Sequence, residues 1–100
     1  MAESSYELVF TPEADGTLND LENDPSHRSL LRAVDDVLVR IERGLCAGDR
    51  DTKVLVLQVS HRVVRSTPVE GSDWYVIWSA ASEEGDVGIL YIGPQSEAQP

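Results

Sequence analysis

The chain has 100 residues, of which 41% are hydrophobic, so it is large enough for one globular domain with a core of its own. No apolar run approaches the ~20 residues that a membrane-spanning helix requires, which argues against a membrane protein. The formal net charge of −10 argues against a dedicated nucleic-acid-binding protein, because contacts with phosphate supply most of the affinity of such complexes.

The charged residues are unevenly distributed along the chain. Residues 1–24 carry seven acidic side chains and residues 66–100 carry six, and neither stretch contains a Lys or Arg. All eight basic residues fall within residues 25–65, where five acids leave a net charge of +3. The sequence therefore predicts a local basic patch on an otherwise acidic molecule.

Composition also limits the chemistry and the location of the protein. Cys46 is the only cysteine, so the chain cannot form an internal disulfide, and this fits a reducing environment. One cysteine and two histidines cannot supply the three or four ligands of a zinc site, and we expect neither a metal ion nor another cofactor. The N-terminal residues lack the basic start and apolar stretch of a signal peptide, so we expect a cytoplasmic protein.

The first quarter of the chain predicts a strand and a short helix. Residues 6–10 (Y-E-L-V-F) place every second apolar side chain on one face, as in a strand. Thr11 is a suitable helix cap and Pro12 a suitable first helical residue. We expect a helix over residues 14–23. Its propensity is weak, because Gly16 lies within it.

The strongest pattern in the sequence belongs to a second helix. Asp24 and Pro25 form a start signal, and Gly44 is a stop signal just after a last turn that contains arginine. Between these signals apolar residues recur at helical spacing: Leu30, Leu31, Val34, Val37, Leu38, Ile41 and Leu45. We expect this apolar stripe to pack on a sheet.

Extended segments follow the second helix. Residues 54–59 are a near-continuous apolar run, and residues 61–69 continue in an extended pattern. Pro68 predicts that the end of this segment lies at an edge or in a loop, because proline has no N–H to donate within a central strand.

Residues 74–80 and 87–92 are rich in β-branched and aromatic residues and predict a β-hairpin with its turn near Gly85. In the first arm Trp74, Val76 and Trp78 share one face, and Tyr75, Ile77 and Ser79 share the other. Both faces are largely apolar, which predicts a central strand.

The predicted order is β-α-α-β-β-β. Helices grouped early and strands grouped late indicate an α+β fold, with two N-terminal helices on one face of a mostly antiparallel, twisted sheet. We expect one domain over residues 1–94 and a disordered tail over residues 95–100.

Several side chains are candidates for a functional site, each with an alternative interpretation. Arg62 and Arg65 are three residues apart, so on a regular strand they face opposite ways, and a shared phosphate site requires a bulge. The alternative is two solvated arginines paired with acids. His61 is either a general base or an ordinary surface histidine. Trp74 and Trp78 form either a partner-binding surface or part of the core.

The order of elements and the hairpin residues resemble the RelE/ParE superfamily, the toxins of bacterial type II toxin–antitoxin systems. The resemblance rests on the opening Y-E-L-V-F-T-P-E-A, on the helix that ends in I-E-R-G, and on the two strands D-W-Y-V-I-W and V-G-I-L-Y-I. It covers residues 5–93. It implies a toxin that inhibits translation or gyrase and is neutralised by a cognate antitoxin, with the ribosome, mRNA or gyrase as targets.

In the ribosome-dependent ribonucleases of this superfamily, basic residues and a tyrosine on the sheet act on mRNA. The resemblance places Arg62 and Arg65 at the basic positions, and together with His61 and Tyr91 they form the candidate catalytic set. The sequence departs from the pattern where Tyr75 replaces a hairpin arginine. It also has Pro94-Gln95 where a basic pair is common.

These departures argue against activity as an mRNA endoribonuclease more than against inhibition of gyrase. Two hypotheses follow. The first is the toxin described above. The second is a non-catalytic protein-interaction module on the same fold, in which Tyr75 joins Trp74 and Trp78 as a partner contact. Its support is the acidic composition and the missing C-terminal bases.

Overall fold

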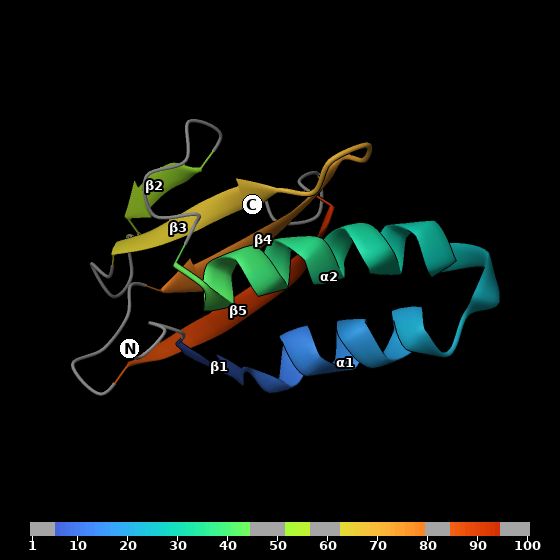
Figure 1. Cartoon of the computed structure of the whole chain (residues 1–100), viewed down its shortest axis with the longest axis horizontal. Coiled ribbons are helices and arrows are strands. Elements are labelled where there is room, and N and C mark those ends of the chain that lie inside the picture. The colour runs from blue at the N-terminus through green and yellow to red at the C-terminus, as the bar shows by residue number, and fades with distance from the viewer. Residues whose placement is uncertain (1–5, 45–51, 57–62, 80–84, 95–100) are drawn as a thin grey trace.

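The protein consists of two helices packed against one face of a five-stranded sheet (Figure 1), as seen in a computed structural model that describes residues 6–44, 52–56, 63–79 and 85–94. The strands are β1 (Glu7–Phe10), β2 (Lys53–Val56), β3 (Val63–Pro68), β4 (Trp74–Ser79) and β5 (Asp86–Pro94). The helices are α1 (Pro12–Glu22), the short 3₁₀ helix η1 (Pro25–His27) and α2 (Arg28–Glu42). The predicted α+β class is confirmed.

The sheet has the strand order β1-β5-β4-β3-β2 and is mixed. β2, β3, β4 and β5 form three antiparallel pairs, whereas β1 pairs with β5 in parallel. The described chain therefore has the order β-α-α-β-β-β-β, one strand more than predicted. The sequence pattern did not divide residues 54–69 because an apolar run has no internal marker for the turn between two strands.

The start of α1 follows from its capping residues. Thr11 Oγ1 accepts a hydrogen bond from the N–H of Ala14 at 3.2 Å, and Pro12 is the first helical residue, as the sequence predicts. The Thr11 hydroxyl also donates to the carbonyl of Leu90 at 3.2 Å, so the cap ties α1 to β5. The helix begins two residues before the predicted segment because these capping signals prevail over its weak interior.

The second predicted helix is divided at its beginning. Asp24 caps η1, and α2 begins only at Arg28. The predicted stop is confirmed, because Gly44 adopts a φ of 74° and donates to the carbonyl of Ile41 at 3.0 Å. The core residues of α2 are Val34, Val37, Leu38 and Ile41, all at most 5% exposed. Neither α1 nor α2, the α-helices of the described chain, has the length and hydrophobicity of a membrane span.

The two faces of the sheet are distinct in composition. The face that the helices cover, here called the helix-side face, carries buried side chains from the hairpin: Val76, Trp78, Val87, Ile89 and Ile92. Residues directly paired across strands share a face, so Tyr75, Ile77 and Tyr91 lie on the opposite face. A register shift between Ile77 and Trp78 keeps both Trp78 and its partner Ile89 on the helix-side face.

The predicted hairpin and its central position are confirmed, because β4 is the third strand of five and pairs with β5. The prediction for Pro68 also agrees with the register: Pro68 pairs with Tyr75 of β4, but the pairing with β2 ends earlier, at Ser66. The predicted tail at residues 95–100 lies outside the described residues.

Candidate functional site

The structure separates two members of the candidate catalytic set. Arg65 pairs with Trp78 and therefore lies on the helix-side face, whereas Tyr91 pairs with Ile77 on the opposite face. His61 and Arg62 lie outside the described residues. Arg65 and Tyr91 thus do not share a site.

Arg65 is held by the side chains of the core. Its Cζ lies 5.6 Å from the ring centroid of Trp78, within the range of a cation–π contact. The Trp78 indole is 4% exposed, and its Nε1 donates to Oγ1 of Thr67 at 3.0 Å. The Thr67 hydroxyl is in turn hydrogen-bonded to that of Thr52 at 2.8 Å. These hydrogen bonds link β4 to β3 and to the residue before β2, and they orient the indole that Arg65 contacts.

An aromatic pair occupies the opposite face. The rings of Tyr75 and Tyr91 meet edge to face, with centroids 5.8 Å apart and planes at 82°. The Tyr91 hydroxyl donates to the carbonyl of Pro94 at 3.0 Å. Partial burial raises the pKa of the Tyr75 phenol above its usual value of 10.0, so this group is neutral at physiological pH.

The opposite face therefore lacks a fixed cation from the β3–β5 region that the structure describes. Arg65 is the only Lys or Arg after residue 62, and it faces the helices. Stabilising a phosphoryl transition state requires cations aimed at the developing charge. Within the described residues of β3–β5, this face therefore offers the Tyr75–Tyr91 pair for contact with a base or an apolar side chain, and Lys53 of β2 lies on the same face.

The three predicted partner contacts lie in three different environments. Trp78 is buried in the core, Tyr75 lies on the opposite face, and Trp74 is half-buried at the end of β4. Trp74 lines a cleft. Trp74 and Trp78 do share the predicted face, but the helices cover one indole and leave the other partly accessible.

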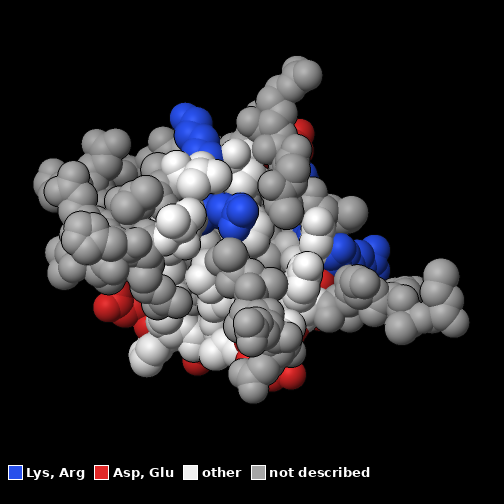
Figure 2. Space-filling view, turned by 90° about the vertical axis from the view of Figure 1, so that its left-hand side faces the viewer, with Lys and Arg blue, Asp and Glu red and all other residues white. Residues whose placement is uncertain are grey.

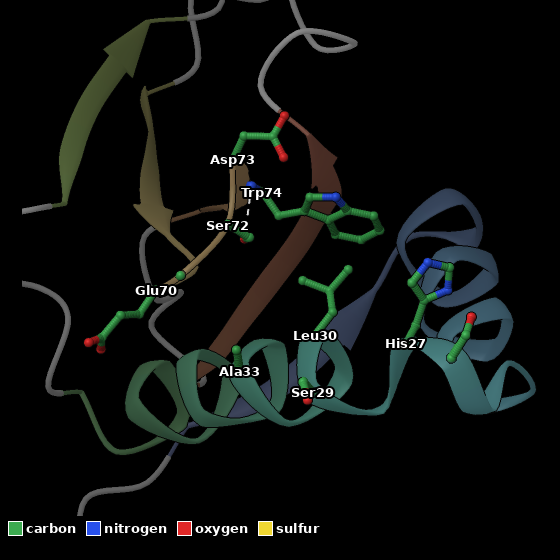
Figure 3. A pocket seen from close by; sticks show the side chains of 10 residues that line it. His27, Ser29, Leu30, Ala33, Glu70, Ser72, Asp73 and Trp74 are labelled. Carbon is green, nitrogen blue, oxygen red and sulfur yellow. Dashed lines mark hydrogen bonds between the residues drawn. The ribbon is translucent and has the colours of Figure 1, made fainter.

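The Trp74 cleft lies between the start of α2 and the turn that joins β3 to β4 (Figure 3). Its volume is about 530 Å³. Leu30 and Ala33 of α2 and the Trp74 indole supply its apolar surface, with His27 at one side. In Figure 3 the Trp74 indole and Leu30 point toward each other, while Glu70 points away from the cleft. The cleft therefore has an apolar part formed by Trp74 and Leu30, and its lining also includes serines, His27 and two acidic residues, Glu70 and Asp73.

Local hydrogen bonds hold both walls of the cleft. Ser72 Oγ accepts from the N–H of Trp74 at 3.1 Å and donates to the carbonyl of Val69, so the turn positions the indole. On the other wall, Nδ1 of His27 lies 3.0 Å from a carboxylate oxygen of Asp24. Hydrogen bonds from the Ser26 side chain and backbone lower the pKa of that carboxyl, which favours the charged cap of η1.

Sequence reasoning found Trp74 but missed the residues that complete the cleft. Leu30 was assigned to the apolar stripe of α2, and it does pack against the core while also lining the cleft. Ser72 belongs to a turn whose role depends on the fold. The one available signal was that the apolar stripe begins at Leu30, near the beginning of the helix, where a sheet of limited width can leave it partly uncovered.

Within the described residues, no group of three or more His, Cys, Asp and Glu side chains is placed to hold a metal ion. Cys46 lies outside these residues. Figure 2, which views the end of the molecule that lies at the left of Figure 1, shows basic side chains within a largely uncharged surface. Most acidic side chains visible there follow the lower rim.

No protein-family model matches the sequence, and no curated protein sequence matches it. Solved structures do match. A YoeB/ParE toxin from Agrobacterium tumefaciens superposes with a TM-score of 0.70 at 10% identity, covering 89% of this chain and 98% of that one. A metal-bound toxin from Helicobacter pylori gives a TM-score of 0.66 at 14% identity, covering 94% and 99%.

A third match, to the chromosomal ParDE TA system from P. aeruginosa, has a TM-score of 0.50 at 13% identity and covers 91% of this chain and 97% of that one. Nearly the whole of each structure is thus reproduced at very low sequence identity. The chain has a YoeB/ParE-like fold, and the resemblance predicted from the sequence is confirmed at the level of the fold.

Proposed function

We propose that the chain is the toxin component of a type II toxin–antitoxin system, that it acts in the cytoplasm on translation or on gyrase, and that a cognate antitoxin neutralises it. The observation that carries this proposal is the fold, which is shared over 89% of the chain with a YoeB/ParE toxin. We extend the domain to residues 1–94, as the sequence pattern suggests.

We further propose that the toxin acts by binding its target and not by cleaving mRNA. The support comes from the sheet: Arg65 is stacked on Trp78, and Tyr75 and Pro94 stand where the superfamily pattern has bases. Catalysis of phosphoryl transfer without fixed cations forgoes its largest stabilising interaction. Inhibition of gyrase requires only a complementary surface, which an acidic protein can provide.

The Trp74 cleft is the proposed contact for the partner protein. A half-buried indole beside Leu30 offers a pocket for one apolar side chain, and such anchors supply much of the affinity of protein interfaces. Trp78 is buried in the core and does not line this cleft. Tyr75, on the opposite face, is a second and separate contact surface.

The proposal is tested by expressing the chain from a tightly controlled promoter. We expect growth arrest, relief of the arrest by the small reading frame next to the gene, and inhibition of DNA supercoiling by purified gyrase with no cleavage of mRNA on ribosomes. Cleavage of mRNA would refute the binding mechanism, and normal growth with unaffected gyrase and ribosomes would refute the toxin assignment.

A non-catalytic interaction module is the second candidate function, favoured by the apolar Trp74 cleft in a chain with incomplete catalytic residues. It predicts a stable complex with a protein partner and no growth arrest. Trp74→Ala should weaken that complex, whereas Val9→Ala, at an exposed position of β1 that does not line the cleft, serves as the control.

A further inference from the structure

The outer edge of the sheet at β2 carries an exposed surface that is both apolar and basic. Three large hydrophobic side chains are exposed in the described chain. Val54 (62% exposed) and Val63 (51%) lie on β2 and β3, and Val9 (49%) lies at the opposite edge on β1. Val54, Val63, Lys53 and Arg65 together form what is here called the β2 edge surface.

The register shows that three of these side chains share one face. Val54 is paired with Arg65, and Val63 lies two residues before Arg65 on the same strand. Because Arg65 is paired with Trp78, this is the helix-side face. Helix α1 contacts β5 and α2 contacts β4, and in Figure 1 both helices lie away from β2. The exposure of Val54 shows that they leave this end of the face uncovered.

The described residues of this edge are basic, although the molecule is acidic. No Asp or Glu occurs from Thr52 to Val69, although the chain has 18 acidic residues. In the described part of the structure, neither Lys53 nor Arg65 forms an ion pair, and Arg65 is held in place by its contact with Trp78. An acidic group that approaches this edge therefore meets cations that have no carboxylate partner within the described chain.

The backbone of β2 offers a second means of recognition. Within the described residues β2 pairs only with β3 and ends the sheet. In an antiparallel pair, alternate residues of an edge strand direct both N–H and C=O away from the sheet. An extended segment from another chain can pair with these groups and thereby become a sixth strand.

We propose that the β2 edge surface binds an extended, acidic segment of a partner protein by strand addition. An added strand would lie ~4.8 Å from β2, so that one residue stands opposite Val54 and its neighbour stands opposite Lys53. An apolar residue suits the first position and an acidic residue the second. The inference rests on the proposed function only in identifying the partner as the antitoxin.

Two other occupants fit the surface less well. A second copy of this chain would join two molecules of net charge −10, and its own β2 strand contains no acidic residue to pair with Lys53. Lysine on an edge strand is a common protection against such self-pairing, yet it favours an acidic partner. A single-stranded RNA would be attracted by the two cations, but it would leave both valines and the β2 backbone unmatched.

The test measures binding of synthetic peptides to the full chain by fluorescence anisotropy, at low and at physiological salt. The probe is a labelled peptide of about eight residues that alternates Glu and Val, and the control peptide has Lys in place of Glu. Val54→Glu and Val9→Glu form a matched pair of variants, since each places an acid at an exposed valine of a different sheet edge. Circular dichroism confirms that each variant is folded.

We expect the acidic peptide to bind and the basic peptide not to bind, with weaker binding at higher salt. Val54→Glu should weaken binding by about tenfold or more, Val9→Glu by less than about twofold, and Lys53→Glu should reverse the preference between the peptides. Equal effects of Val54→Glu and Val9→Glu would overturn the proposal. So would a preference for a single-stranded RNA probe, or a dimer of the free chain that Val54→Glu abolishes.

Amide chemical shifts of the unmodified chain provide an independent measurement, because peptide-induced shifts should be centred on β2 and not on β1. Neither readout depends on toxicity. A chain that arrests growth but binds no acidic peptide would refute this inference and leave the proposed function intact. A chain that binds the acidic peptide but does not arrest growth would support this inference and refute the proposed function.

Discussion

Replacing Thr67 with valine removes one hydroxyl from the core while nearly preserving the volume of the side chain. In the native protein this hydroxyl accepts from Trp78 Nε1 at 3.0 Å and is bonded to the Thr52 hydroxyl at 2.8 Å. Thr67 is 1% exposed and Trp78 is 4% exposed. Water therefore cannot readily replace the lost acceptor, and the buried indole N–H is left without a partner.

A buried donor without an acceptor costs about 1–3 kcal/mol, a large part of the 5–15 kcal/mol by which a typical domain is stable. For a domain of this size the corresponding decrease in Tm is roughly 5–20 °C. Urea unfolding followed by tryptophan fluorescence and by circular dichroism measures the change. The dependence of the unfolding free energy on urea should stay the same, because the surface exposed on unfolding does not change.

Two further variants show whether the indole bond is responsible. Thr52→Val removes the outer hydroxyl but leaves Trp78 bonded to Thr67, so its cost should stay below about 1 kcal/mol. In a Trp78→Phe background, which has no indole N–H, Thr67→Val should cost less than in the native chain. Equal destabilisation by the two valine substitutions, or the same cost of Thr67→Val in both backgrounds, would refute the reasoning.

The remaining predictions concern backbone conformation and ionisation. Gly44→Ala should lower the free energy of unfolding by about 1 kcal/mol or more, because φ at this position is 74°. Gly16→Ala should raise the free energy of unfolding by up to about 1 kcal/mol, because Gly16 is helical and the added methyl group meets no atom within 4 Å. Chemical denaturation measures both changes. Hydrogen bonds from Ser26 lower the pKa of Asp24. The stabilising effect of the Asp24 carboxylate should therefore be fully present above pH 3.8 and be lost as the pH falls through the folded-state pKa. Asp24→Asn should remove this part of the acid dependence of Tm. Since burial raises the pKa of Tyr75, stability should be retained below pH 10.0 and fall as the pH rises through the folded-state pKa, and the ultraviolet absorbance titration of the native chain minus that of Tyr75→Phe should show a phenol that ionises late.

The features that the sequence predicts well are those determined by neighbouring residues. The Thr11 cap, the Gly44 stop and the apolar stripe of α2 all occur as expected, because each depends on contacts within a few residues. The alternation along β4 likewise places Trp74 and Trp78 on one face. These local signals identify most of the helices and strands, and the order of those elements then indicates the α+β fold class.

The candidate site depended on contacts that the sequence does not encode locally. Whether Arg65 faces a tyrosine or a tryptophan is decided by the register between β3 and β4, and a shift of one residue would reverse it. The parallel pairing of β1 with β5 and the cleft beside Trp74 join segments that are distant in the chain. No periodicity within either segment could have revealed them.

The internal bonding of the sheet favours a protein partner over a chemical reaction. The Tyr91 hydroxyl donates to the Pro94 carbonyl and so already stabilises the fold, and Arg65 lies on the other face of the sheet from Tyr91. The features that the described chain leaves incomplete are an apolar cleft beside a half-buried indole and a strand edge with exposed valines. Both are completed by another polypeptide, since one accepts an apolar side chain and the other accepts a strand. A small molecule cannot pair with a strand edge, so a polypeptide is the class of ligand that fits both features.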